Sequence, residues 1–234
     1  MTSASGQVIH SVEQACTPEE SAELLRLMET LIAASDGRYV VGGRRQESVH
    51  EIPDHTARQA AEVYEPNGRI ECTDIPPEAE KLLEEILIRS LPSIRYAYPD
   101  AVRDNGWFYV EYGEGQYVNP HVDYHGRIGD PWPGVLATVS LTVRGAEAGG
   151  QFFVESSGDA SIWEEPHVAR RGLDWSTPSF REQRRVRWTA SQQAGDMVIW
   201  GSQVVHGTAP VQAGRACKFL TQLLTPEEGP AADG

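Results

Sequence analysis

The pattern of apolar and polar positions along the chain changes from a helical period to a strand period. Near the N-terminus, residues 17–36 carry apolar side chains on one helical face, and Thr17-Pro18-Glu19-Glu20 has the composition of a helix start. A second amphipathic helix is predicted over residues 74–91, ending before Pro92, because proline disrupts a helix interior. Short strands are predicted between them at 38–42 and 48–52.

From residue 106 onward, the apolar runs have the length of strands and are separated by turns rich in glycine and proline. Helices followed by many short strands are typical of an α+β fold, in which a β-sandwich or barrel carries helices on one outer face. The predicted strands are 107–112, 135–143, 151–155, 197–200 and 217–224.

The domain organisation is predicted to be simple. A chain of 234 residues is long enough for one substantial core, so we expect a single domain. Within it, we expect a helical support region at 8–104, a strand-rich core at 105–225 and a flexible tail at 226–234.

Composition narrows the class of protein. With 40% hydrophobic and 23% charged residues, the chain has the composition of an ordinary globular protein. It shows no secretory signal and no run long enough for a membrane span, so we expect no membrane partner. Its three scattered cysteines (Cys16, Cys72 and Cys217) indicate free thiols in a reducing, cytoplasmic compartment. A net charge of −14 argues against a nucleic-acid partner.

The candidate chemistry lies in His121-Val122-Asp123 and the distant His206. Two imidazoles and one carboxylate form a facial triad that holds Fe(II) on one side and leaves positions open for substrate and O₂. His121 and Asp123 are two residues apart, so on an extended strand both point to the same side. His125 is a rival third ligand, but residues four apart on a strand are separated by about 13 Å.

A cation is expected behind this metal site. Residues 207–214 predict a turn, after which the chain returns as a strand, so Arg215 is expected near His206. A buried guanidinium needs an anionic partner, and its planar shape suits a carboxylate. These features predict a small diacid that chelates the metal and pairs with Arg215. Lys218 is a possible substitute, but it faces the other side of the strand, and we favour Arg215.

Four segments carry a resemblance to a known family. YGEGQYVNPHVD, LATVSLTV, GGQFFVES and AGDMVIWGSQVVHGTAPVQAGRACKFL resemble the Fe(II)/2-oxoglutarate-dependent oxygenase superfamily, and most of all its prolyl-4-hydroxylase-like branch. The similarity covers residues 105–225. Many relatives in that branch carry lysine at the position of Ala216, which is a departure in this chain.

The resemblance implies a double-stranded β-helix (jelly roll) fold. It also implies that His121, Asp123 and His206 bind Fe(II) and that Arg215 binds the distal carboxylate of 2-oxoglutarate. Tyr112 resembles a residue that assists at that carboxylate, and Thr138 and Ser140 are further candidates. The implied activity is hydroxylation of a C–H bond using O₂, with succinate and CO₂ as co-products.

The substrate is expected to be a small molecule, such as an amino acid or a specialised metabolite. Arginines between 170 and 187 favour an anionic substrate or one tethered to a carrier protein. The candidate substrate-binding residues are His125, Arg127, Trp132, Trp163, Arg184 and Arg185. The cluster from His50 to His55 is interpreted as a surface loop that could also form part of the substrate entrance.

Three other functions remain open. The chain could hydroxylate a peptide or protein side chain, bind a metal in a jelly roll without oxygenase activity, or act as a zinc hydrolase, because zinc accepts the same ligand types.

Overall fold

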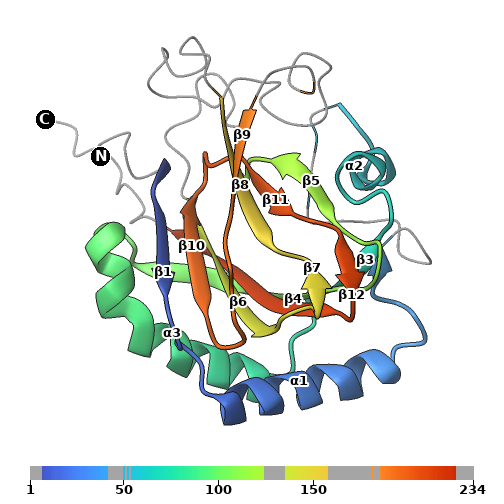
Figure 1. Ribbon diagram of the computed structural model, residues 1–234. Coiled ribbons are helices and arrows are strands. Elements are labelled where there is room, and N and C mark those ends of the chain that lie inside the picture. Colours follow the sequence, from blue (N-terminus) through green and yellow to red (C-terminus); the bar gives the residue numbers. More distant parts are fainter. Residues whose placement is uncertain are drawn as a thin grey trace, which may run out of the picture.

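The computed structural model describes residues 7–41, 50, 52, 54–123, 135–157, 181 and 185–224. Three helices and thirteen strands lie in this part of the chain (Figure 1). None of these helices combines the length and the apolar character that crossing a bilayer would require.

The first predicted helix is confirmed as α1 (Pro18–Ala33). Thr17 is its N-cap: the Thr17 hydroxyl accepts a hydrogen bond from the Glu20 amide, and the Glu20 carboxylate accepts one from the Thr17 amide. This capping box satisfies two amide groups that have no partner within the helix.

The second predicted helix is observed as α3 (Pro77–Ala97), and its predicted end before Pro92 is wrong. Pro92 lies inside α3 on the exposed side. The carbonyl deprived of its partner belongs to Ile88, whose side chain is 58% exposed, so water can satisfy it. Burial of Leu87, Ser90 and Ile94 on the opposite face continues across the proline and maintains the helix.

The strands form two facing layers. A seven-stranded sheet, called here the major sheet, has the order β1-β10-β6-β13-β4-β3-β2, and a four-stranded minor sheet has the order β5-β11-β8-β9. The major-sheet strands are β1 (Ile9–Val12), β2 (Val40–Val41), β3 (Arg69–Cys72), β4 (Arg103–Tyr112), β6 (Val135–Arg144), β10 (Met197–Gly201) and β13 (Ala216–Leu224). The minor-sheet strands are β5 (Val118–His121), β8 (Phe152–Ser157), β9 (Arg185–Thr189) and β11 (His206–Thr208). A separate pair joins β7 (Ala148–Gly149) to β12 (Val211–Ala213).

Helices α1 and α3 cover the outer face of the major sheet (Figure 1). The largest core cluster joins their apolar faces to residues such as Tyr109, Leu141 and Phe219. The opposite face of the major sheet is turned toward the minor sheet, with α2 (Ala57–Tyr64) beside β5. The architecture is therefore the predicted jelly-roll core with helices on its outer face.

The N-terminal region contributes more to the sheets than expected. Strands β1, β2 and β3 all precede residue 105, yet all three join the major sheet, where β1 pairs with β10, β3 with β4, and β2 with β3. Of the predicted early strands, 38–42 contains β2, whereas most of 48–52 lies outside the described residues. Helix α2, β1 and β3 were not predicted.

Candidate metal centre

Two neighbouring strands of the minor sheet bring the two histidines together. In the antiparallel pairing of β5 and β11, His121 lies directly opposite His206. Directly opposite residues project to the same face of a sheet with Cβ atoms about 5 Å apart. The ring centroids of the two imidazoles are 4.3 Å apart. The chain reaches His206 by leaving β10 in the major sheet and turning into β11 in the minor sheet.

Gly207 permits this close pairing. A Cβ atom at position 207 would lie 2.6 Å from the Phe153 ring and 2.6 Å from the Val118 carbonyl oxygen. Both contacts are shorter than real Cβ contacts, and one of them is with backbone. The residue after His206 is therefore restricted to glycine by the strands on either side of β11.

Two side chains of the major sheet hold Asp123 in position. Its Oδ2 atom accepts hydrogen bonds from the Thr138 hydroxyl at 2.5 Å and from the Trp200 indole N–H at 2.8 Å. Thr138 lies on β6 and Trp200 on β10, so both sheets take part in the site. The other oxygen, Oδ1, is 3.4 Å from His206 Nε2 and 3.7 Å from His121 Nε2.

The donor atoms of His121, Asp123 and His206 all lie within 4.8 Å of one another. Each histidine Nδ1 faces a backbone carbonyl, of Asn119 at 2.8 Å for His121 and of Val204 at 2.9 Å for His206. A carbonyl only accepts, so Nδ1 carries the ring proton and Nε2 presents its lone pair to the centre. Two imidazole nitrogens and one carboxylate oxygen thus converge as predicted, and the residues present fit a divalent transition metal.

Burial keeps both imidazoles neutral. It lowers the pKa of His121 well below its ordinary value, and the neighbouring His206 and His50 lower this pKa further. Burial also lowers the pKa of His206, although the Asp123 carboxylate opposes that shift. Neutral imidazole is the form that binds metals, so the protein environment favours the ligand state.

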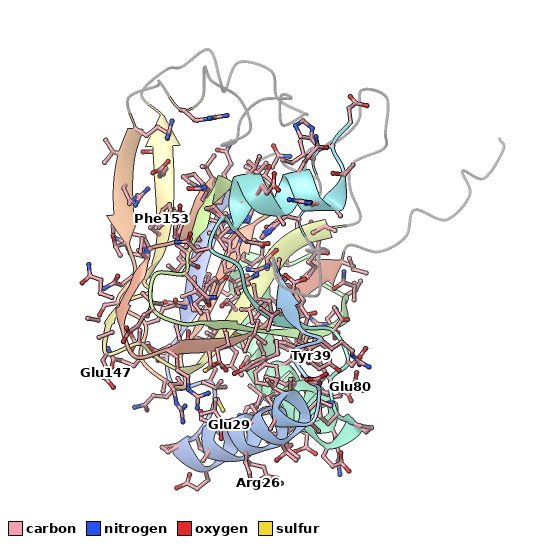
Figure 2. All side chains as sticks on the ribbon, turned by 90° about the vertical axis from the view of Figure 1, so that its right-hand side faces the viewer. Arg26, Glu29, Tyr39, Glu80, Glu147 and Phe153 are labelled. Carbon is pink, nitrogen blue, oxygen red and sulfur yellow. The ribbon has the colours of Figure 1, made fainter. Side chains whose placement is uncertain are left out.

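The structure does not bring Arg215 to this centre, which corrects the expectation for that residue. Its guanidinium forms ion pairs with Glu111 of β4, at 3.2 Å, and with Glu29 of α1. Figure 2 shows Glu29 in the helical layer, well separated from Phe153 of the minor sheet. Arg215 lies with Cys217 on the helix-covered face of the major sheet, because both contact Glu111.

Lys218 is a buried cation on the face of the major sheet that is turned toward the minor sheet. It is 4% exposed, and no hydrogen bond or ion pair joins it to any other residue in the described part of the chain. Burial lowers its pKa to about 8. Its charge also contributes to the lowered pKa of His206, as expected if the two side chains lie near each other. Strand alternation did separate Lys218 from Arg215, but the face turned toward His121, Asp123 and His206 is that of Lys218.

Polar groups surround Lys218 on the inner face of the major sheet. Thr142 pairs with Lys218 across β6 and β13, and its buried hydroxyl has no hydrogen-bond partner among the described residues. Ser140 is also buried, and it lies on β6 between Thr138 and Thr142. Tyr112 is buried on β4, where its hydroxyl accepts a hydrogen bond of 2.6 Å from Arg69. Thr138, predicted to assist at the cosubstrate, instead holds Asp123.

Most predicted substrate residues cannot be placed. His125, Arg127, Trp132, Trp163 and Arg184 lie outside the described residues. Arg185 lies on β9, where it pairs with Glu155 at 2.6 Å. The exposed fractions of the Arg185 and Glu155 side chains are 9% and 6%, and Glu155 is shared with Arg187, which pairs with it at 2.7 Å.

Two contributors were missed. Trp200 was read only as part of a strand, although a buried indole N–H requires an acceptor, which here is Asp123. His50, interpreted as part of a surface loop, has its Nε2 atom 3.0 Å from His121 Nε2. Its Nδ1 atom is 2.5 Å from Glu65, which is fully buried. The burial of Glu65, Arg69 and Glu71 is visible only in the structure, so the sequence carried no signal for the position of His50.

Comparison with known proteins identifies the fold. No protein-family model matches the chain, and no curated protein matches it significantly. A collagen prolyl hydroxylase of Paramecium bursaria Chlorella virus-1, solved with 2OG, matches with a TM-score of 0.54 and 12% identity, over 94% of this chain and 97% of that one. AviO1 from Streptomyces viridochromogenes matches with a TM-score of 0.57 and 16% identity, over 96% and 92%.

A third similar structure is the non-heme alpha-ketoglutarate-dependent carbocyclase SnoK from nogalamycin biosynthesis. It has a TM-score of 0.58 and 14% identity, over 94% of this chain and 80% of that one. At these identities the likeness establishes the fold, and it extends over nearly the whole chain. The chain therefore has the fold of the 2-oxoglutarate- and Fe(II)-dependent oxygenases.

Proposed function

We propose that this protein is a non-haem Fe(II)/2-oxoglutarate-dependent dioxygenase. The observation that carries the proposal is the convergence of His121 Nε2, Asp123 Oδ1 and His206 Nε2 within 4.8 Å, inside a fold shared with such enzymes. These three residues would hold the metal on one side and leave its other side open. With 2-oxoglutarate bound, Fe(II) supplies the activation of O₂ for oxidation of a C–H bond, with succinate and CO₂ as co-products.

Lys218 is proposed as the residue that binds the distal carboxylate of 2-oxoglutarate, in place of Arg215. An ammonium group buried without a partner is unfavourable, and an incoming carboxylate removes that cost. The Thr142 hydroxyl, also without a partner among the described residues, supplies a donor beside it. Arg215 already has two carboxylate partners, so it has no comparable need for a ligand.

The proposed substrate is a small molecule, and the proposed reaction is hydroxylation. SnoK, named for its part in nogalamycin biosynthesis, supports a small substrate, while the viral collagen prolyl hydroxylase supports a peptide or protein side chain as the alternative. SnoK is a carbocyclase, so ring formation remains an alternative outcome of the same site. A carrier-tethered substrate stays a prediction, as does a cytoplasmic location, which the three buried, unpaired cysteines support.

The position of Lys218 also discriminates against a zinc hydrolase or a simple metal-binding module. Hydrolysis at a zinc site needs a metal-bound water and no buried anchor for a second carboxylate. An ammonium group near His206 that has no partner among the described residues favours a diacid as the ligand.

The test is to add Fe(II) and 2-oxoglutarate to the protein without O₂ and to record the visible spectrum, then to admit O₂ and measure succinate. We expect a charge-transfer band and slow succinate formation even without substrate. Asp123→Ala should abolish both. Folded protein that binds Fe(II) but gives neither signal would contradict the proposal and favour the hydrolase or the binding module.

A further inference from the structure

Two large apolar side chains, Trp188 and Val186, lie exposed on strand β9, with exposed fractions of 54% and 73%. Strand β9 comes last in the order of the minor sheet and runs beside β8 (Figure 1). Residues two apart on a strand point to the same face, so the two side chains form one patch. Single exposed apolar residues are ordinary, whereas a patch next to a functional centre indicates a binding surface.

The strand register places this patch in line with the proposed metal ligands. The directly opposite pairs across the minor sheet are His121 with His206, His206 with Val154, and Val154 with Trp188. Directly opposite residues project to the same face, so these four side chains form one row on the inner face of the sheet. Neighbouring strands are about 4.8 Å apart, so the backbone at Trp188 is two strand spacings, or about 10 Å, from that at His206.

The apolar surface continues from the proposed metal centre to Trp188. Phe152 lies on the same face of β8 as Val154, is 3% exposed and stacks with His206 at a centroid distance of 5.7 Å. Ala190, whose amide donates to the Phe152 carbonyl, is also buried. Exposure then increases along β9 from Ala190 to Trp188 and beyond, so the row passes from core to open surface. An apolar wall that leads from a reactive centre to solvent is typical of a small-molecule site.

The charged side chains of β9 lie on the other face of the strand. Arg185 and Arg187 alternate with Trp188 in the sequence, and both pair with Glu155 of β8. The side chains of β9 that flank Trp188 on its own face, Val186 and Ala190, carry no charge. The expectation that Arg185 contacts an anionic substrate therefore does not apply at this patch, and an uncharged group fits it better.

We propose that Trp188 is a specificity-determining residue that stacks against a flat, uncharged aromatic ring of the substrate. This inference rests on the proposed function and narrows its substrate class to small molecules that carry such a ring. An indole offers a broad apolar face, and two aromatic rings gain from their mutual geometry in addition to the area that they bury. The separation of about 10 Å fits an extended molecule, with the ring at one end and the oxidised C–H bond at the other.

The test uses 6-fluoro-2-naphthol, a neutral aromatic probe, with metal-loaded protein and 2-oxoglutarate in the absence of O₂. Fluorine NMR of the Zn(II)-loaded protein measures the Kd of the probe. Replacement of Zn(II) by paramagnetic Mn(II) then shows, from faster fluorine relaxation, whether the bound probe lies near the metal. We expect binding with faster relaxation in Mn(II). Trp188→Ala should raise the Kd at least about tenfold, because stacking and buried area are both lost, and Trp188→Phe should keep most of the affinity.

Tyr96→Ala is the matched control, because Tyr96 is an aromatic residue of α3 that is 90% exposed and lies in the helical layer. The Kd and the relaxation should be unchanged in this variant. An unchanged Kd in Trp188→Ala, or no binding of the probe by the unaltered protein, would overturn the inference. Binding without any effect of Mn(II) on relaxation would also overturn it, because the probe would then lie away from the metal. Failure of the unaltered protein to bind Mn(II), measured by calorimetry, would instead overturn the proposed function.

Discussion

Lys218 and Arg215 lie on opposite faces of the major sheet. Substituting each one therefore separates the proposed binding of the 2-oxoglutarate carboxylate from ion pairing beneath the helices. Lys218→Met removes the proposed partner of the distal carboxylate and should raise KM for 2-oxoglutarate by about 30-fold or more, since loss of one member of a buried charge pair costs ~2–5 kcal/mol. The same variant should unfold at a higher temperature without cosubstrate, because it removes a buried charge that has no partner in the described part of the chain. Succinate kinetics and thermal denaturation measure the two effects.

Arg215→Met is the matched control. It breaks ion pairs with Glu29 and Glu111 that are partly open to solvent, so we expect a stability loss of only ~1 kcal/mol or less and an unchanged KM. A large rise in KM for Arg215→Met, with none for Lys218→Met, would restore the original expectation for Arg215.

The lowered pKa of Lys218, about 8, predicts opposite effects of pH on binding and on stability. Only the ammonium form attracts a carboxylate, so affinity for 2-oxoglutarate should fall roughly tenfold between about pH 7 and pH 9. In the unfolded chain this lysine holds its proton to about pH 10.4. The unfolded state therefore binds more protons between these two pKa values, and stability without cosubstrate should rise with pH in that window.

Calorimetry of 2-oxoglutarate binding to the Co(II)-loaded protein measures the first effect, and denaturant unfolding measures the second. Lys218→Met should flatten both profiles in this range. A binding profile that falls identically in Lys218→Met would assign the titration to another group.

At the scale of elements, strands β6 and β10 orient the proposed metal ligand Asp123, which belongs to neither strand. Thr138 and Trp200 lie side by side in the register of these strands and bind the same oxygen of Asp123. Thr138→Val keeps the shape of the side chain and removes one hydrogen bond, so Co(II) affinity should fall roughly 10–100-fold. Calorimetry without cosubstrate measures this.

Thr142→Val is the control for that substitution, since Thr142 lies on the same face of β6 and its hydroxyl binds no described residue. Metal affinity should be unchanged in Thr142→Val. Equal losses of Co(II) affinity in the two variants would mean that a change in strand β6, and not the lost hydrogen bond to Asp123, weakens metal binding.

The elements also show what sequence reasoning could and could not reach. Periodicity and capping residues predicted α1 and the main core strands, because these signals are local. The end of α3 was misjudged at Pro92, because burial of one helix face outweighed a local penalty. The candidate triad could be proposed from residue types and their spacing. Whether Lys218 or Arg215 faces the triad depends on which layer covers each side of β13, and this is a tertiary property. His50 was missed for the same reason, since its partners Glu65 and His121 are remote along the chain.

At the scale of the whole molecule, the proposed ligand set joins the two sheets. His121 and His206 come from the minor sheet, while Asp123 is bound to β6 and β10 of the major sheet. A metal held by all three should oppose separation of the layers and stabilise the folded state. At a free concentration 100 times its dissociation constant, the metal should add about 2.7 kcal/mol, or an increase in Tm of roughly 5–10 °C for a domain of this size.

Thermal denaturation in Co(II), compared with chelator-treated protein, measures this increase. The net charge of −14 would by itself attract any divalent cation, so Mg²⁺ at equal concentration is the control for charge screening. Mg²⁺ prefers oxygen ligands, and two of the three donors here are imidazoles, so it should produce little of the effect. In Asp123→Ala the Co(II) effect should shrink to that of Mg²⁺, because one of the three ligands is lost. An undiminished increase in Asp123→Ala would place the stabilising ion elsewhere on the acidic surface and remove the connection between the sheets.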